Sequence, residues 1–294
     1  MRVGPQGRDR ADRLGGKSPS KWRMAMKHGQ QQALANALLG PGDPEPVVLQ
    51  NPAGRSPILF ISDHGGRAVP RRLGRLGLSE AELARHIGWD IGIQGVTSRL
   101  SDKLDATYIY QPYSRLVIDC NRKVGSAQSI MERSDGVEVP GNRGLSEAEK
   151  QARDIEIMRP YHRCIEETLA RRRAAGQPTV IFCMHSCTPH LASDAEPRPW
   201  HIGVIAYRDW RIGDSLLALL EAEPGLCVGR NEPYSVNLEM DYTVPVHCEG
   251  RGVPYGEIEI RQDLIGDEAG QRRWAALLEP LLPRSVERSE VLAA

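Results

Sequence analysis

The stretch Thr179–His185 (TVIFCMH) decides the fold class, because an uninterrupted apolar run ends there at a histidine. A second run of the same kind, Pro57–Ser62 (PILFIS), is followed by Asp63 and His64. Short continuous apolar runs are typical of strands that are buried on both faces, as in parallel sheets. Ligand-binding and catalytic groups lie at the carboxyl ends of such strands. We therefore predict that each strand ends at its histidine and that the two imidazoles lie at one edge of a sheet.

Strand-like and helix-like segments alternate along the rest of the chain. Ser79–Glu82 and Ser146–Glu149 are capping boxes, in which a serine and a glutamate three residues later satisfy free backbone N–H groups at a helix start. The expected strands are 47–49, 57–61, 107–110, 116–118, 179–184, 202–206, 226–229 and 256–261, and the expected helices begin at 79 or cover 91–104, 146–175, 209–221 and 267–282. This alternation predicts an α/β fold, a three-layer sandwich with a mixed, mostly parallel central sheet.

Length and composition narrow the class of protein. The chain has 294 residues, enough for one large α/β domain, and its 38 acidic and 38 basic side chains give a formal net charge of zero. A nucleic-acid partner is not expected, since such proteins carry a basic excess. No apolar run approaches the roughly 20 residues of a transmembrane helix, so no membrane partner is expected either. Six cysteines without a CxxC framework fit buried thiols of a reducing compartment, and the cytoplasm is the expected location.

The N-terminal part of the chain differs from the rest. Residues 1–22 contain almost nothing apolar, which predicts either a disordered segment or an over-extended gene start, with Met24 or Met26 as the true first residue. Residues 27–40 predict a short helix that ends at a proline-rich turn. We expect a flexible extension over 1–45, a single catalytic domain over 46–285 and a tail over 286–294.

Two histidines and a carboxylate indicate a metal site. Imidazole nitrogens and carboxylate oxygens are usual ligands of zinc, and catalytic zinc sites use three protein ligands. His64 and His185 are the first two candidates and Asp90 is the third, with Asp63 and Glu232 as weaker alternatives. Structural roles stay open for each: a turn histidine, a core histidine and a helix N-cap, respectively.

Two glutamates in the last expected strand suggest acid–base chemistry. Glu257 and Glu259 alternate with isoleucines, so both face the same side of the strand. One of them is a candidate general base, the alternative being a solvated sheet face with ion pairs to Arg261. His247 is a candidate hydrogen-bonding group for substrate or an oxyanion, or a loop histidine.

The segment Ser114–Arg122 (SRLVIDCNR) places arginines and an asparagine around a short apolar run. Guanidinium groups bind carboxylates through two parallel hydrogen bonds, which predicts a clamp for an anionic substrate. The candidate substrate-binding residues are Arg115, Asn121, Arg122 and Arg67. Surface salt bridges are the alternative, and Asp119 is expected to orient one of the arginines or a histidine.

A cysteine nucleophile is a rival chemistry. Cys183 and His185 lie two residues apart in a strand and so share one face. Cys183 or Cys187, with His185 as base, would make a cysteine hydrolase. That hypothesis leaves the segment around His64 unexplained.

Together these segments resemble the N-formylglutamate amidohydrolase family. The likeness lies in His64–Pro70, Trp89-Asp90, Ser114–Arg122, His185-Ser186 and Glu257–Ile265, which follow the family's order and span about residues 46–283. The chain is more similar to the broad branch of this family than to its histidine-degradation members.

The resemblance implies a phosphorylase/hydrolase-like fold similar to that of zinc exopeptidases, with zinc or another divalent ion as cofactor. In carboxypeptidase-like enzymes an Asn-Arg pair grips the substrate carboxylate and a late glutamate activates the metal-bound water. Asn121-Arg122 and Glu259 look like those elements. Carboxypeptidases take two ligands from His-x-x-Glu, whereas Arg67 stands three residues after His64 here, so Asp90 is the candidate for the remaining ligand.

The implied function is hydrolysis of the amide of an N-acyl acidic amino acid such as N-formylglutamate, a reaction of amino-acid metabolism. Glu259 and His247 are the expected catalytic groups. A second hypothesis is a non-catalytic binder of anionic metabolites or peptides, which keeps the arginines but holds no metal. The acyl group, the amino acid, the metal and the oligomeric state stay open.

Overall fold

The computed structural model describes residues 1, 37–194 and 196–292. The chain divides into two units, Met1–Ala37 and Leu38–Ala294, and the second contains the fold described below. This unit includes residues that the sequence analysis assigned to the extension, since Leu38 is buried and its N–H donates to Glu156 Oε1 at 2.8 Å. The predictions for residues 1–22, and for the helix 27–40 up to residue 36, lie outside the described residues apart from Met1.

A mixed sheet forms the centre of the fold and confirms the predicted architecture. In spatial order its strands are β1 (Val48–Gln50), β3 (Thr107–Tyr110), β2 (Ile58–Ser62), β6 (Val180–Cys187), β9 (Tyr255–Arg261), β7 (Ile202–Ile205) and β8 (Val228–Arg230). Strands β3, β2, β6 and β9 are parallel neighbours, whereas β1 runs antiparallel to β3. β7 runs antiparallel to β9 and parallel to β8. The carboxyl ends of β2 and β6 therefore lie side by side at one edge of the sheet.

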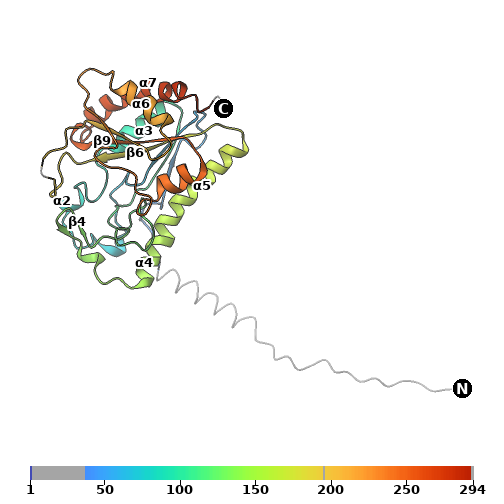
Figure 1. Cartoon of the computed structure of the whole chain (residues 1–294). Helices are drawn as coiled ribbons and strands as arrows, with labels where there is room; N and C mark the ends of the chain where they lie inside the picture. Colours follow the sequence, from blue (N-terminus) through green and yellow to red (C-terminus); the bar gives the residue numbers. More distant parts are fainter. Residues whose placement is uncertain (2–36, 195, 293–294) are drawn as a thin grey trace. The chain divides into compact units, whose positions relative to one another are not determined.

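Helices cover both faces of the sheet (Figure 1). Alternate side chains such as Phe60 and Phe182 point to the face covered by α3, α6 and α7, while Ile61 and Ile181 point to the face covered by α5. The helices are α2 (Glu80–Leu83), α3 (Ile93–Lys103), α4 (Glu147–Arg153), α5 (Arg159–Ala174), α6 (Arg211–Leu220) and α7 (Glu268–Arg288). Short 3₁₀ helices lie at Arg71–Leu73, Pro140–Asn142, Glu249–Arg251 and Gln262–Leu264, and π turns lie at Asp154–Met158 and Val244–Cys248. Burial on two apolar faces explains why the central strands are apolar throughout.

Both predicted capping boxes are confirmed. The Ser79 hydroxyl accepts from the Glu82 N–H, and the Ser146 hydroxyl accepts from the Glu149 N–H. The helix that starts after Ser146 passes through the π turn before α5. Pro160 follows that turn and has no N–H to donate to the preceding turn, which is a usual cause of such a local widening.

The structure differs from the sequence prediction at β6, at 116–118 and at 123–144. Strand β6 continues two residues beyond His185, because β9 pairs with it as far as Cys187. The segment 116–118 is not a strand: its backbone turns at Ser114, and its side chains are apolar because they are buried in the core. Residues 123–144, for which the sequence predicted no strand or helix, contain a hairpin of β4 (Arg133–Ser134) and β5 (Val137–Glu138), whose Asp-Gly turn is a recognisable hairpin signal.

The end of α7 extends the fold beyond the expected boundary at 285. Val286 is buried against the core, and the helix runs to Arg288.

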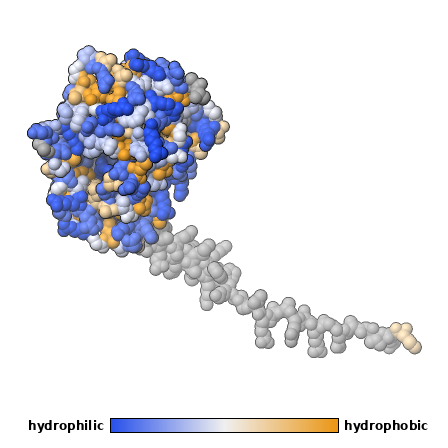
Figure 2. Space-filling model, viewed as in Figure 1, coloured by the Kyte–Doolittle hydropathy of each residue, from blue (hydrophilic) through white to orange (hydrophobic). Residues whose placement is uncertain are grey.

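Hydrophilic and apolar residues are interspersed over the face seen in Figure 2. None of the helices in the described part of the chain has the length and apolar character needed to cross a membrane.

Candidate active site

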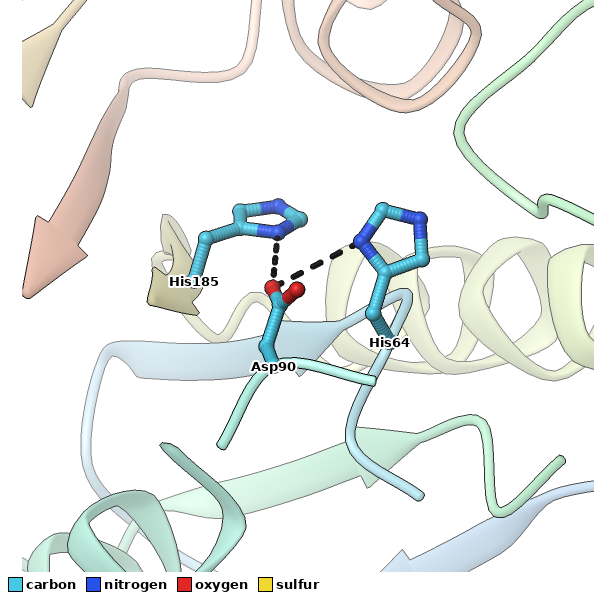
Figure 3. A group of neighbouring side chains, drawn as sticks. All are labelled: His64, Asp90 and His185. Atoms are coloured by element: carbon cyan, nitrogen blue, oxygen red, sulfur yellow. Dashed lines mark hydrogen bonds and ion pairs between the residues drawn. The ribbon is translucent and has the colours of Figure 1, made fainter. Parts of the chain in front are cut away.

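His64, Asp90 and His185 meet at the carboxyl edge of the sheet (Figure 3). His64 follows β2, and His185 lies in the last part of β6. Asp90 comes from the loop before α3, and its backbone N–H donates to the His64 carbonyl at 3.0 Å. This backbone bond fixes the Asp90 loop to the end of β2, so three residues that are distant in sequence share one site.

Both imidazoles present their Nδ1 atoms to the same carboxylate oxygen. The Nδ1 of His185 is 2.9 Å from Asp90 Oδ2, and the Nδ1 of His64 is 3.5 Å from that oxygen. One potential ligand atom from each of the three residues lies within 4.8 Å of the other two, and all three residues are buried. Asp90 is not the helix N-cap that the alternative predicted, because Gly92 occupies that position.

A second carboxylate lies behind each ring. The His64 Nε2 is 2.8 Å from Asp119 Oδ1, and the His185 Nε2 is 3.5 Å from Asp63 Oδ2. Burial favours the neutral acid, but Arg115 and His64 outweigh it and hold the pKa of Asp119 well below its usual value. Carboxylates at the outer nitrogen orient metal-binding histidines and raise their basicity. Asp63, a weaker candidate for ligand, therefore lies behind His185.

The three side chains open into a cavity of about 470 Å³, called the central cavity below. Its wall includes more carboxylates than guanidinium groups. The charged residues along it are Asp90, Asp241, Glu257, Glu259, Arg115 and Arg122. Since a dicarboxylate would add further negative charge, a bound cation would make this cavity more favourable for such a ligand.

Glu257 and Glu259 face the central cavity from β9, as the strand alternation predicted. Glu259 is the register partner of His185, whereas Glu257 is the partner of Cys183, two residue pairs further from the carboxyl end of β6. Burial raises the pKa of Glu259 to about 8 and that of Glu257 to about 7. A carboxyl group with a pKa near neutrality can both accept and release a proton during a reaction.

Three of the four expected substrate-binding residues line the central cavity. Arg115 donates to Asp119 Oδ2 through Nε and Nη2, at 3.0 and 2.7 Å. Arg122 donates to Asp241 Oδ1 at 2.8 Å, and the Asn121 side-chain oxygen accepts from the Thr243 N–H at 3.0 Å. Asp119 thus binds an arginine and a histidine together, as expected.

Arg67 and His247 lie outside the wall of the central cavity. Arg67 is paired with Glu80 at 3.2 Å, and its guanidinium lies over the Trp89 ring. His247 is fully buried on the α5 side, where its Nε2 is 2.9 Å from His162 Nδ1. Neither side chain is among those that the fold brings to the metal-ligand candidates.

The buried histidine pair makes a testable contribution to stability. His162 Nε2 donates to the Cys120 carbonyl, so its Nδ1 accepts from His247, and the remaining His247 nitrogen has no partner among the described residues. Burial lowers the pKa of His247 to about 3. Between about pH 6.5 and 3 the unfolded chain takes up a proton that the folded chain does not, so stability falls as the pH falls through that window, by at most about 1.4 kcal/mol per pH unit.

From pH 7 to pH 5, we expect the free energy of unfolding to fall by about 1–2 kcal/mol less in His247→Gln than in the wild type. The variant lacks the histidine that only the unfolded chain protonates. Urea denaturation at several pH values measures this directly. Parallel stability curves for the two proteins would contradict the assignment of a neutral, buried His247.

The cysteine alternative finds little support. Cys183 is buried in the core beside Cys248, and their contact together with burial raises its pKa well above the usual value. Cys187 lines the central cavity, but burial strongly raises its pKa as well. Thiolates are the reactive form of cysteine, and both environments disfavour them.

The sequence analysis missed one wall of the central cavity. It consists of residues 233–241, which follow β8 in a turn-rich segment without periodicity. Tyr234, Asn237 and Asp241 come from it. Glu232, a weaker ligand candidate, precedes this wall and is not part of it.

Comparisons with known proteins show which family this chain resembles. The family model described as N-formylglutamate amidohydrolase matches residues 56–266, which contain all three metal-ligand candidates and Glu259. A crystal structure of a gene product from Agrobacterium tumefaciens is 34% identical, with a TM-score of 0.82, and covers 86% of this chain and 99% of the other. A crystal structure of N-formylglutamate amidohydrolase from Ralstonia eutropha is 21% identical, with a TM-score of 0.60, and covers 85% of this chain and 99% of the other.

No curated protein is similar enough to this chain to count as a match. The family model spans well over half of the sequence, and the members of that family are hydrolases that act on an amide bond of a small molecule. The chain belongs to the N-formylglutamate amidohydrolase family and is an amidohydrolase.

Proposed function

We propose that this protein is a metal-dependent amidohydrolase that cleaves the N-acyl amide of an acidic amino acid, with N-formylglutamate as the representative substrate. The observation that carries the proposal is the buried group His64, Asp90 and His185 beside Glu259 in one cavity. We also propose a cytoplasmic location, since all six cysteines are unpaired.

The residues present fit a divalent ion, with zinc as the first choice. His64 Nδ1 is buried and has no hydrogen-bond partner in the described part of the chain, which leaves its lone pair available. Two imidazoles and a carboxylate are a donor set that zinc accepts, with a position left for water or substrate. When bound by His64, Asp90 and His185, the ion would polarise the acyl carbonyl and acidify a water molecule.

Glu259 is the proposed general base. Its side chain projects into the central cavity from the strand next to β6, in register with His185. Its Oε2 is buried without a hydrogen-bond partner among the described residues. We propose that this oxygen takes the proton of the attacking water and passes it to the leaving amine, which its raised pKa favours.

The arginines of the cavity wall are the proposed clamp for the substrate carboxylates. Arg115 is fixed by Asp119, so its orientation is set before substrate binds. Arg122 forms an ion pair with Asp241, and a substrate carboxylate would compete with Asp241 for the guanidinium group. We keep Asn121 in this group because it holds the Thr243 segment beside Arg122.

We expect Arg122→Met to raise the KM for N-formyl-L-glutamate by roughly 10- to 100-fold with little change in kcat, since a hydrogen bond to a charged group contributes about 1.5–3 kcal/mol. Steady-state kinetics of formate release measure both constants. Arg67→Met is the matched control, because it removes an arginine outside the cavity wall and is expected to leave KM unchanged.

The direct test is hydrolysis of N-formyl-L-glutamate, followed as formate release, with and without a chelator. We expect turnover that the chelator abolishes and added zinc restores. Turnover that persists in metal-free protein would contradict metal dependence, and inactivity on N-formyl and N-acetyl amino acids alike would contradict the substrate class. Loss of activity on alkylation of Cys187 but not on chelation would favour the cysteine chemistry instead.

A further inference from the structure

One polar group of the central cavity has no role in the proposed chemistry. Tyr234 lines the cavity together with Glu259, and its hydroxyl accepts a hydrogen bond from Arg198 Nη1 at 2.7 Å. A tyrosine hydroxyl can accept and donate at the same time. Within residues 37–194 and 196–292 no acceptor receives the hydrogen of this hydroxyl. The hydroxyl is therefore a free donor at the cavity wall.

Arg198 is built into the fold rather than exposed on the surface. Its side chain is 9% exposed, and its Nε donates to Asp194 Oδ2 at 3.0 Å. Its Cζ lies 4.8 Å from the Tyr234 ring centroid. Because the hydroxyl oxygen accepts from a cation, the O–H bond is polarised and becomes a stronger donor to a third group.

The backbone places Tyr234 close to Glu259. Gly203 on β7 is the register partner of Glu259. A methyl group at Gly203 would lie 1.8 Å from the Glu232 carbonyl oxygen and 3.6 Å from the Glu259 Cβ. The backbone just before Tyr234 thus packs against Gly203, which lies beside Glu259 in the sheet. Only glycine leaves room for this backbone segment.

A hydrogen-bond donor of this kind would accelerate amide hydrolysis, in addition to the proposed metal ion. Negative charge develops on the acyl oxygen as water adds to the carbonyl carbon, and a preorganised hydrogen-bond donor stabilises that charge more than the neutral carbonyl. We propose that the Tyr234 hydroxyl, held and polarised by Arg198, donates a hydrogen bond to the acyl oxygen in the transition state. Arg198 acts through Tyr234 as a positioning residue. This inference rests on the proposed amidohydrolase reaction.

The experiment compares metal-loaded wild type with Tyr234→Phe on N-formyl-L-glutamate. We expect kcat to fall about 10- to 100-fold with KM changed less than about twofold, since a donor that acts only in the transition state affects kcat. Tyr207→Phe is the matched control: Tyr207 is similarly exposed (39% against 40%) and also carries an arginine over its ring, but it lies outside the cavity. It is expected to keep wild-type constants.

Two further measurements separate this role from others. Calorimetric binding of L-glutamate, which has no acyl group, is expected to be the same in wild type and Tyr234→Phe. Arg198→Gln is expected to reduce kcat about 3- to 10-fold, and the double variant is expected to be no slower than Tyr234→Phe alone, because the arginine works through the hydroxyl.

An unchanged kcat in Tyr234→Phe, or a rise in KM with weaker L-glutamate binding, would overturn the inference, the second outcome making Tyr234 a carboxylate-binding group. So would additive losses in the double variant. These outcomes differ from failure of the proposed function, which appears as an inactive or metal-independent wild type.

Discussion

Glu259→Gln is expected to lower kcat by roughly 10²- to 10⁴-fold while the KM and the bound metal change little. Glutamine keeps the size of the side chain but cannot accept the proton of the attacking water. Formate release from N-formyl-L-glutamate gives kcat and KM, and elemental analysis of the purified variant gives its metal content.

Glu257→Gln is the matched control for this experiment, since it removes the other cavity-lining carboxyl group of β9. Glu257 pairs with Cys183, whereas Glu259 pairs with His185, so Glu259 comes from the strand position beside a proposed ligand. We expect Glu257→Gln to lose much less than Glu259→Gln. The reverse order would assign the base to Glu257, and near-native kcat in Glu259→Gln would remove Glu259 from the mechanism.

His185→Ala is expected to lose its metal and about 10³-fold or more in kcat/KM, because a bound ion contributes several kcal/mol and about 1.4 kcal/mol is tenfold in rate. Wild type is expected to contain about one divalent ion per chain. Elemental analysis, activity and thermal unfolding of the same samples distinguish loss of the ion from loss of the fold.

His190→Ala is the control for that variant. His190 is an exposed histidine in the loop after β6, outside the wall of the central cavity, and its removal is expected to leave metal content and activity unchanged. A His185→Ala protein that keeps its ion and its rate would contradict the proposed ligand set.

Much of the fold is readable in the sequence because its signals are local. Capping boxes at Ser79 and Ser146 and the apolar runs around Phe60 and Phe182 each arise within a few residues. The wrong strand at 116–118 has a physical cause: Leu116–Ile118 is apolar because it is buried, and burial alone does not distinguish a strand from a buried turn.

The sequence by itself determined that two histidines come near the ends of buried strands, and that Glu257 and Glu259 share one face, because side-chain alternation is a property of the strand. Only the tertiary structure decided which groups surround them. It brings Asp90 to both imidazoles through a backbone bond to His64, and it turns Arg67 outward. Such placements depend on loops and on strand order, in which residues far apart in sequence become neighbours, and no local pattern encodes those distances.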